Sequence, residues 1–292
     1  MLRSADVARR AASASCSEVR SASGAAHGVD RRGRASPVHK VVVEGSLMSV
    51  VDTVKAHTPW VIRSGARTIK RRIRWARNSR RPVDEVFQEV YQRAMWGGEV
   101  GEFCSGPGSD SDAAALYAVG IAELIATRGI RSVVDLGCGD FCVAGRLLSG
   151  SDVGYIGVDV VEPLIRQNIA NHRSSRVDFA CLNIITDALP DGELCLIREV
   201  LQHLSNAEIL RVMPKLRQYR YVVYSDYQPG PLAPCVPNRD IGHGIDTRIW
   251  KDSALFLDQP PFQVPMKLLF EAPSPIILRH PGECIRTYLL WP

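Results

Sequence analysis

The 292-residue sequence predicts an α/β protein built on one doubly wound, mostly parallel sheet, with an N-terminal helical extension. Short apolar runs of strand length alternate with longer amphipathic stretches from residue 82 onward. One such run, residues 132–136, leads directly into a glycine turn and a helical pattern, and a second run, residues 154–159, follows. This order is typical of a βαβ unit, in which the two strands lie parallel.

The composition is that of a globular protein with unpaired cysteines. Hydrophobic residues make up 46% of the chain, and no apolar run approaches the length needed to span a bilayer. The eight cysteines include no C-x-x-C pair, which favours buried reduced thiols over a metal site or a disulfide framework. We therefore predict no metal and expect a cytoplasmic protein.

The first 81 residues differ from the rest in charge. Residues 1–81 contain 18 Lys/Arg and 5 Asp/Glu (+13), whereas residues 82–292 contain 18 and 26 (−8). Residues 1–47 lack periodicity, so we expect a disordered leader or a start assigned too early, with Met48 as the true first residue; an organelle transit peptide is a further alternative. Residues 48–81 are expected to be a basic helical segment, and residues 82–292 the folded domain.

Within the basic segment, residues 60–81 carry nine basic residues and no acidic one. Apolar residues recur there at the spacing of one helix face: Ile62, Ala66, Ile69, Ile73 and Ala76. The pattern predicts a basic amphipathic helix outside the core, with Arg63, Arg67, Lys70, Arg71, Arg74 and Arg77 on its remaining surface. Such a helix could make peripheral contact with an acidic membrane or bind RNA or an acidic partner; a solvated helix packed loosely on the domain is the alternative.

The elements of the folded domain follow in order. Helices are predicted at residues 83–95, 112–128, 142–148, 162–172 and 205–216. Gly129 is expected to cap the second of these, and Ser205 and Glu208 form a capping box at the start of the last. Seven strands are predicted, at residues 132–136, 154–159, 176–182, 194–197, 220–225, 266–271 and 285–291.

The turn after the first strand reads D-x-G-x-G, from Asp135 through Gly137 to Gly139. A third glycine, as in a dinucleotide-binding turn, is replaced by Cys142, and the absence of a following Lys excludes a phosphate loop. An acidic residue before the turn disfavours a pyrophosphate and suits a ligand with ammonium and sulfonium groups. Asp159 ends the next strand, 20 residues (159 − 139) after the turn, where a ribose-binding acid is expected.

These motifs resemble the class I S-adenosylmethionine-dependent methyltransferases. The resemblance spans roughly residues 86–292 and is carried by V-V-D-L-G-C-G-D-F, Y-I-G-V-D-V and L-C-L-I-R-E-V-L-Q-H-L-S-N. It implies a Rossmann-like sheet whose last strand is antiparallel, S-adenosylmethionine as the cofactor, and methyltransferase activity. The cofactor-binding residues that it implies are Asp135, Gly137, Cys138, Gly139, Asp159, Val160, Asn183, Ile184 and Arg198.

Two parts of this implied site depart from a simple match. Asn183 stands where the family often has an acid that meets the adenine amine, and Asp187 is the second candidate for that role. The Gly- and Pro-rich loop of residues 97–112 lies where the family commonly covers the cofactor. We expect residues 105–109 to touch the methionine end of the cofactor, and a plain linker between helices is the alternative.

Candidates for a general base lie in loops at the carboxyl edge of the sheet. His203 is the first candidate because of its position and its near-neutral ordinary pKa, followed by His243 and then Glu199. A histidine just ahead of a capped helix can instead orient its loop. The loops of residues 198–203 and 226–248 supply hydrogen-bonding groups, so we expect the acceptor to be a hydroxyl of a small polar metabolite or glycan.

Other functions stay open. A nicotinamide-dependent oxidoreductase would share the βαβ unit, but Asp135 and Cys142 count against it. A non-catalytic module would keep the fold and lose the chemistry, whereas the D-x-G-x-G turn and Asp159 are intact. The −8 balance of residues 82–292 disfavours nucleic acid, so an RNA methyltransferase ranks low, as does a protein methyltransferase.

Overall fold

The computed structural model describes residues 60–275 and 280–292, with side chains described from residue 69 onward. The predictions for residues 1–47 and for Met48 lie outside these residues. Among the described residues, no helix is both long and apolar enough to cross a membrane.

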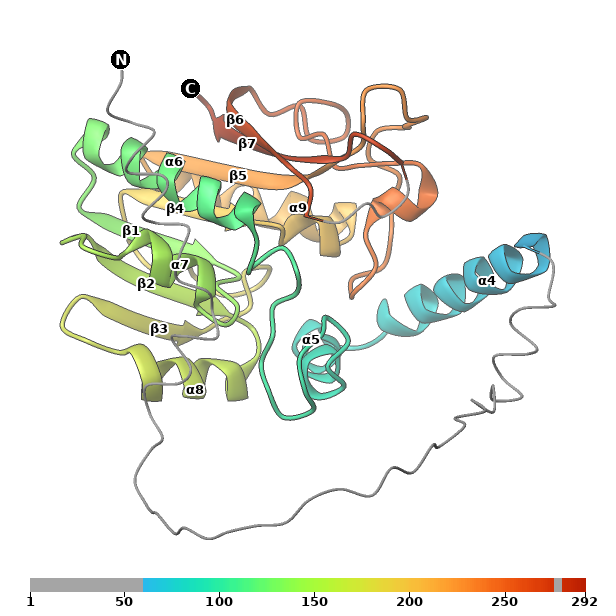
Figure 1. Cartoon of the computed structure of the whole chain (residues 1–292), viewed down its shortest axis with the longest axis horizontal. Helices are drawn as coiled ribbons and strands as arrows, with labels where there is room; N and C mark the ends of the chain where they lie inside the picture. The colour runs from blue at the N-terminus through green and yellow to red at the C-terminus, as the bar shows by residue number, and fades with distance from the viewer. Residues whose placement is uncertain (1–59, 276–279) are drawn as a thin grey trace, which may run out of the picture.

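One seven-stranded sheet forms the centre of the protein (Figure 1). Its strand order is β3-β2-β1-β4-β5-β7-β6, with parallel pairing from β3 through β5 and antiparallel pairing of β7 with both of its neighbours. The Rossmann-like, mostly parallel sheet with an antiparallel last strand is thus confirmed. The strands are β1 (Ser132–Leu136), β2 (Gly154–Asp159), β3 (Val177–Cys181), β4 (Leu194–Arg198), β5 (Tyr221–Gln228), β6 (Met266–Pro273) and β7 (Cys284–Leu290).

The central strands are buried on both faces, which explains their unbroken apolar runs. In β1, Val133 packs into one hydrophobic cluster, whereas Val134 and Leu136 belong to the cluster on the other face. In β4, Leu196 and Ile197 divide in the same way. Because side chains of a strand alternate between the two faces, a short apolar run supplies both halves of the core.

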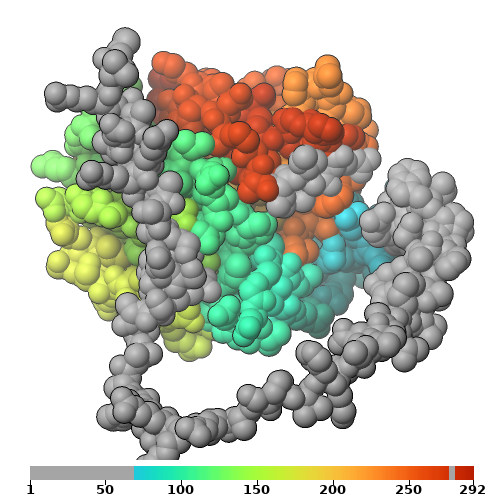
Figure 2. Space-filling view, viewed as in Figure 1, coloured from blue at the N-terminus to red at the C-terminus, as the bar shows by residue number. Residues whose placement is uncertain are grey.

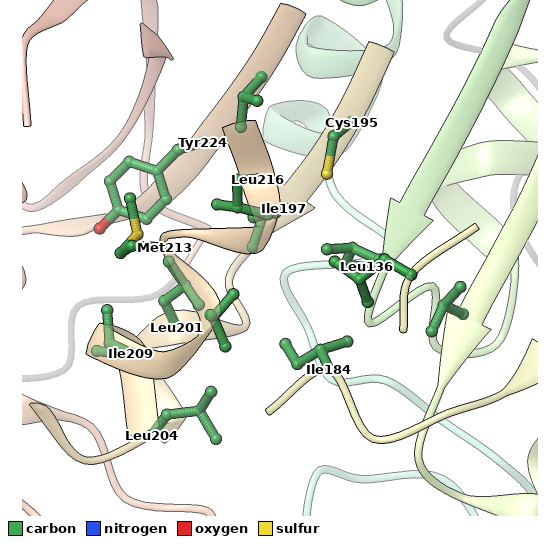
Figure 3. Close-up of a cluster of buried hydrophobic side chains, with 14 of the residues drawn as sticks. Leu136, Ile184, Cys195, Ile197, Leu201, Leu204, Ile209, Met213, Leu216 and Tyr224 are labelled. Carbon is green, nitrogen blue, oxygen red and sulfur yellow. The ribbon is translucent and has the colours of Figure 1, made fainter. Parts of the chain in front are cut away.

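Helices cover the two faces of the sheet. Helices α6 (Asp112–Arg128) and α7 (Cys142–Leu147) pack on one face, and α5 (Val83–Gln92) and α9 (Asn206–Val212) belong to the cluster on the other, while α8 (Glu162–His172) contributes to both. Figure 3 shows the second cluster, in which Ile197 of β4 lies between Leu136 of β1 on one side and Leu201 and Ile209 on the other.

Two predicted helices end earlier than expected. The predicted helix of residues 205–216 stops at Val212, and a separate 3-10 turn, η3 (Lys215–Gln218), follows Pro214. Proline has no backbone N–H and therefore cannot continue the helical hydrogen bonds. The helix predicted for residues 83–95 ends at Gln92, and Ala94, with φ of 47°, turns the chain away.

The basic segment forms helix α4 (Trp60–Asn78), which leads into α5 (Figure 1). In the space-filling view, α5 and the loop after it form the surface between the strands and α4 (Figure 2). The described part of α4 contacts the domain through basic side chains: Arg74 forms an ion pair with Asp246. The apolar stripe faces solvent instead, since Ile69 and Ile73 are exposed.

Candidate active site

A cavity of about 280 Å³ lies at the carboxyl ends of the parallel strands. This is the edge at which open α/β sheets bind ligands. Its walls combine the turn after β1, the ends of β2 and β3, the loops after β4 and β5, helix α5 and the loop of residues 96–109. All nine residues implied as cofactor contacts line it: Asp135, Gly137, Cys138, Gly139, Asp159, Val160, Asn183, Ile184 and Arg198.

The two glycines of the turn make room for other parts of the protein. A Cβ on Gly137 would lie 2.2 Å from a methyl carbon of Val200, and one on Gly139 would lie 2.3 Å from Ser105 Oγ. Both glycines also have positive φ angles, of 78° and 56°. From the sequence we expected a ligand to occupy the space beside both glycines. Part of this space is instead filled by Val200 of the loop after β4 and by Ser105 of the loop before α6.

The loop before α6 is fastened over the turn by a reciprocal pair of hydrogen bonds. The backbone N–H of Asp140 donates to Ser105 Oγ (2.8 Å), and the backbone N–H of Ser105 donates to Asp140 Oδ2 (3.0 Å). Tyr91 of α5 adds a hydroxyl contact to Ser105 of 3.1 Å. Residues 105–109 all line the cavity as a result.

Asp159 and Asp135 are two half-buried carboxylates of the cavity. Asp159 accepts hydrogen bonds from the backbone N–H groups of Gly139 (3.2 Å) and Val161 (3.1 Å), so it ties the end of β2 to the turn. Asp135 accepts one from the Tyr155 hydroxyl (2.9 Å). Burial raises the pKa of each carboxyl to about 6. A ligand that brings a cation or hydroxyl donors would favour the charged forms of both.

Of the two candidates for the adenine end, only Asn183 reaches the cavity. Its side-chain oxygen accepts a hydrogen bond from the Ile185 backbone N–H (3.0 Å). Asp187 does not line the cavity; its carboxylate accepts from the Asn183 backbone N–H (2.9 Å) and from Thr186 (2.8 Å). These bonds lower the pKa of Asp187 and give it a role in the turn.

Arg198 and Glu199 bring several polar atoms to the cavity wall. The Arg198 guanidinium donates to the Gly108 carbonyl (2.9 Å) and lies 5.3 Å from the centre of the Tyr117 ring. Glu199 has a φ of 57°. Its Oε1 lies 2.7 Å from Arg198 Nη2 in an ion pair, but the angles of this contact are not those of a hydrogen bond. Among the described residues, Arg198 Nε, the Tyr117 hydroxyl and Thr247 Oγ1 are buried without a hydrogen-bond partner, so a ligand could satisfy them.

The structure brings His203 to the cavity and leaves His243 outside it. His203 Nδ1 lies 3.0 Å from the carbonyl oxygen of Gly244. A carbonyl only accepts, so Nδ1 carries the proton and Nε2 holds a lone pair. Burial lowers the pKa of His203 to about 4, which keeps the ring neutral at pH 7. His243 is buried away from the cavity, where its Nδ1 lies 2.7 Å from Glu208 of the capping box.

Much of the wall near His203 is aromatic or apolar. Phe87 and Tyr91 of α5 lie beside Trp96, with ring centres 6.1 and 5.0 Å from that of the indole, and Trp96 lies 5.6 Å from the His203 ring. Other apolar or aromatic residues that line the cavity include Val83, Val200, Leu204, Tyr227, Ile245 and Trp250. The sequence showed the apolar face of α5, but nothing in its spacing indicated that this face would close a cavity.

The polar residues predicted in the long loop after β5 mostly hold that loop in place. Arg248 is 1% exposed and donates to the Leu204 carbonyl (2.8 Å) and to Asn206 Oδ1 (2.7 Å). Asn238 donates to the carbonyls of Phe256 and Pro260, both at 2.8 Å. The loop residues that line the cavity are instead Ile245, Thr247 and Trp250.

Known structures with some similarity to the chain are methyltransferases. They include N-methyltransferase NodS from Bradyrhizobium japonicum WM9 (12% identity, TM-score 0.41, 60% of this chain and 94% of that one). Human N-acetylserotonin methyltransferase in complex with S-adenosylmethionine is 11% identical (TM-score 0.40, 72% of this chain and 59% of that one). An O-methyltransferase of a trans-AT PKS multienzyme of Brevibacillus brevis, in complex with S-adenosyl-L-homocysteine, is 19% identical (TM-score 0.33, 40% and 43%).

The chain thus spans less than two thirds of the second and third of these proteins. No protein-family model matches the chain, and no curated protein does either. The TM-scores lie below 0.5. The fold is therefore assigned from the strand order, and the candidate site is assigned from the residues that line the cavity.

Proposed function

We propose that this protein is an S-adenosylmethionine-dependent methyltransferase that acts on a hydroxyl group of a small molecule. The observation that carries the proposal is the joining of the two sequence motifs in one cavity, where Asp159 at the end of β2 accepts a hydrogen bond from Gly139 in the turn after β1. The half-buried carboxylates of Asp135 and Asp159 suit a ligand with a positive charge and hydroxyl donors, which S-adenosylmethionine supplies.

The residues present fit this cofactor part by part. Asp159 would take the ribose hydroxyls, Asn183 with Ile184 would flank the adenine, and Asp135 with the loop of residues 105–109 would face the methionine end. The cofactor supplies an electrophilic methyl group on a sulfonium centre. The protein must then align an acceptor atom with that group and exclude water.

His203 is the residue that we propose as the general base. Its Nε2 lone pair is available because the Gly244 carbonyl fixes the proton on Nδ1. A pKa of about 4 makes His203 a weak base, but the hydroxyl proton becomes strongly acidic as its oxygen gains a carbon substituent. A weak base in the right position is therefore sufficient. Glu199 is less suited because Arg198 pairs with it.

The acceptor is proposed to combine an apolar body with one hydroxyl group. The aromatic wall formed by Phe87, Trp96 and Trp250 favours a flat or apolar body, which differs from the polar metabolite or glycan favoured by the sequence. Thr247 and Gln202, which also line the cavity, could orient the hydroxyl. The acidic balance of residues 82–292 continues to disfavour nucleic acid.

Calorimetry with S-adenosylhomocysteine tests the cofactor assignment directly. We expect the full chain to bind S-adenosylhomocysteine and not NAD, and we expect Asp159→Ala to weaken that binding by at least about tenfold, because it removes the proposed ribose contact. Asp178→Ala is the matched control, since Asp178 lies on the neighbouring strand β3 and pairs with exposed Arg173. Binding of NAD alone, or equal affinities for the two variants, would overturn the assignment. Cofactor binding without methyl transfer to any component of a fractionated extract of the cell of origin would instead support a non-catalytic module.

A further inference from the structure

From residue 69 onward, helix α4 contacts the loop after β5 mainly through one face. Arg74 donates to both carboxylate oxygens of Asp246 (2.7 Å from Nε and 2.5 Å from Nη2), and the Asp246 side chain is 6% exposed. Asn78 donates to the His243 carbonyl (3.2 Å). Added Cβ atoms on Gly242 and Gly244 would lie 2.8 Å from the Trp75 carbonyl oxygen and 2.5 Å from Asn78 Nδ2, so these two glycines let the loop backbone pack closely against the helix.

The opposite face of α4 carries an apolar stripe formed by Ile69, Ile73 and Ala76. Ile69 and Ile73 are 60% and 64% exposed, and Ala76 is exposed too. At about 100° per residue these three lie within about 60° of one another, on the side of the helix away from Asn78. An amphipathic helix usually buries such a stripe against its own protein. Here the polar face is docked and the apolar stripe points outward.

Basic side chains stand on both sides of the stripe. Lys70 follows Ile69 on one side and Arg72 precedes Ile73 on the other, and both are exposed. Arg77 is 55% exposed, although it also pairs with Glu89 of α5. No acidic residue occurs from residue 60 to residue 81. The outward surface of α4 is therefore apolar along its middle and positively charged along its edges.

We propose that this outward face of α4 binds an anionic lipid surface. Isoleucine side chains would enter the boundary between headgroups and acyl chains, while Lys70 and Arg72 would reach the lipid phosphates. RNA would match the charges but leave the isoleucines in water. A second copy of the chain would bring two sets of cations together, and residues 1–59, with nine Lys/Arg and five Asp/Glu, offer no complementary charge either.

Vesicle co-sedimentation of the full chain tests the proposal, which does not depend on methyl transfer. We expect binding to phosphatidylcholine vesicles that contain phosphatidylserine, weaker binding to phosphatidylcholine alone, and loss of binding as salt is raised. Ile73→Asp should lower the partition coefficient by about tenfold or more, because the buried area of one isoleucine is lost. Lys70→Gln and Arg72→Gln should each lower it by roughly fivefold.

Two exposed leucines on other helices provide matched controls for Ile73→Asp. Leu210→Asp on α9 and Leu116→Asp on α6 replace side chains that are 45% and 50% exposed, and both variants should bind vesicles as the unchanged chain does. All variants should keep the melting temperature and the S-adenosylhomocysteine affinity of the unchanged chain, since none of the five positions lines the cavity.

Three results would overturn the proposal. The first is equal binding to neutral and anionic vesicles, or no binding to either. The second is a concentration-dependent dimer that Ile73→Asp dissociates, which would assign the stripe to a second copy. The third is a slow reaction of the thiol of an Ile73→Cys variant with a polar maleimide in the absence of lipid, as measured by mass spectrometry. A slow reaction would show that the chain itself covers the stripe.

Discussion

The proposed cofactor half and the proposed acceptor half of the cavity are built in different ways. The cofactor half comes from consecutive strand ends and turns, and its two carboxylates, Asp135 and Asp159, lie within one βαβ unit. The acceptor half gathers Phe87, His203 and Trp250 from a helix and loops far apart in the chain. A site made by one local unit is recognisable from its sequence motif, whereas a site assembled by packing depends on every element that brings its parts together.

The sharpest test of this difference compares two histidines, and it carries the largest expected effect. His203→Ala should lower turnover by roughly two to four orders of magnitude while leaving S-adenosylhomocysteine affinity nearly unchanged, because proton removal acts in the transition state. Steady-state kinetics with the acceptor and calorimetry with the product cofactor measure the two quantities. The matched variant His243→Gln should leave turnover within about twofold, since His243 lies outside the cavity. Equal losses in the two variants would give His203 only a structural role.

The cofactor half should respond to pH in a way that the acceptor half does not. Burial raises the pKa of Asp135 and of Asp159 to about 6, and the ammonium group and ribose hydroxyls of S-adenosylhomocysteine favour the charged forms of these carboxyls. Affinity for S-adenosylhomocysteine should therefore be highest above pH 7 and fall as pH drops through 6, by roughly tenfold per carboxyl at pH 5. Neutral His203, with a pKa of about 4, adds no change in this range.

Calorimetry across this pH range should separate the two carboxyls. Asp135→Asn should bind more weakly at pH 8 and lose roughly half of the logarithmic pH dependence, because one of the two titrating groups is gone. An affinity that is flat between pH 5 and pH 8 would contradict the charge-based account of the cofactor half.

The two halves also differ in how far the sequence predicted them. Strands β1 and β2 begin and end at the predicted residues, because their apolar runs stop at a glycine turn and at an acidic residue. The capping box of α9 and the C-cap Gly129 of α6 likewise form hydrogen bonds only to residues a few positions away in the sequence. Local chemistry of this kind is visible in a sequence.

The acceptor half of the cavity and the orientation of α4 could not be predicted from local sequence chemistry. The apolar faces of α5 and α4 have similar patterns, yet Phe87 is buried against the domain, whereas Ile73 faces solvent. The polar face of α4 is held by distant residues, among them Asp246, whose carboxylate binds Arg74. Periodicity identifies a face, but only tertiary packing decides which face is turned inward.

The smallest expected effect is on the free energy of unfolding. Comparing alanine variants of two glycines distinguishes the cost of packing in the glycine turn from the cost of backbone strain. Gly139 and Gly150 both have positive φ angles, of 56° and 73°, so alanine at either position costs about 1–2 kcal/mol from the backbone. A Cβ on Gly150 meets nothing within 4 Å, whereas one on Gly139 would lie 2.3 Å from Ser105 Oγ. Gly139→Ala should therefore be less stable than Gly150→Ala by about 1–3 kcal/mol in denaturant unfolding, because Ser105 must leave Asp140. Equal stabilities would mean that the loop over the turn yields freely, and the cofactor half would then be less rigid than its short sequence motif suggests.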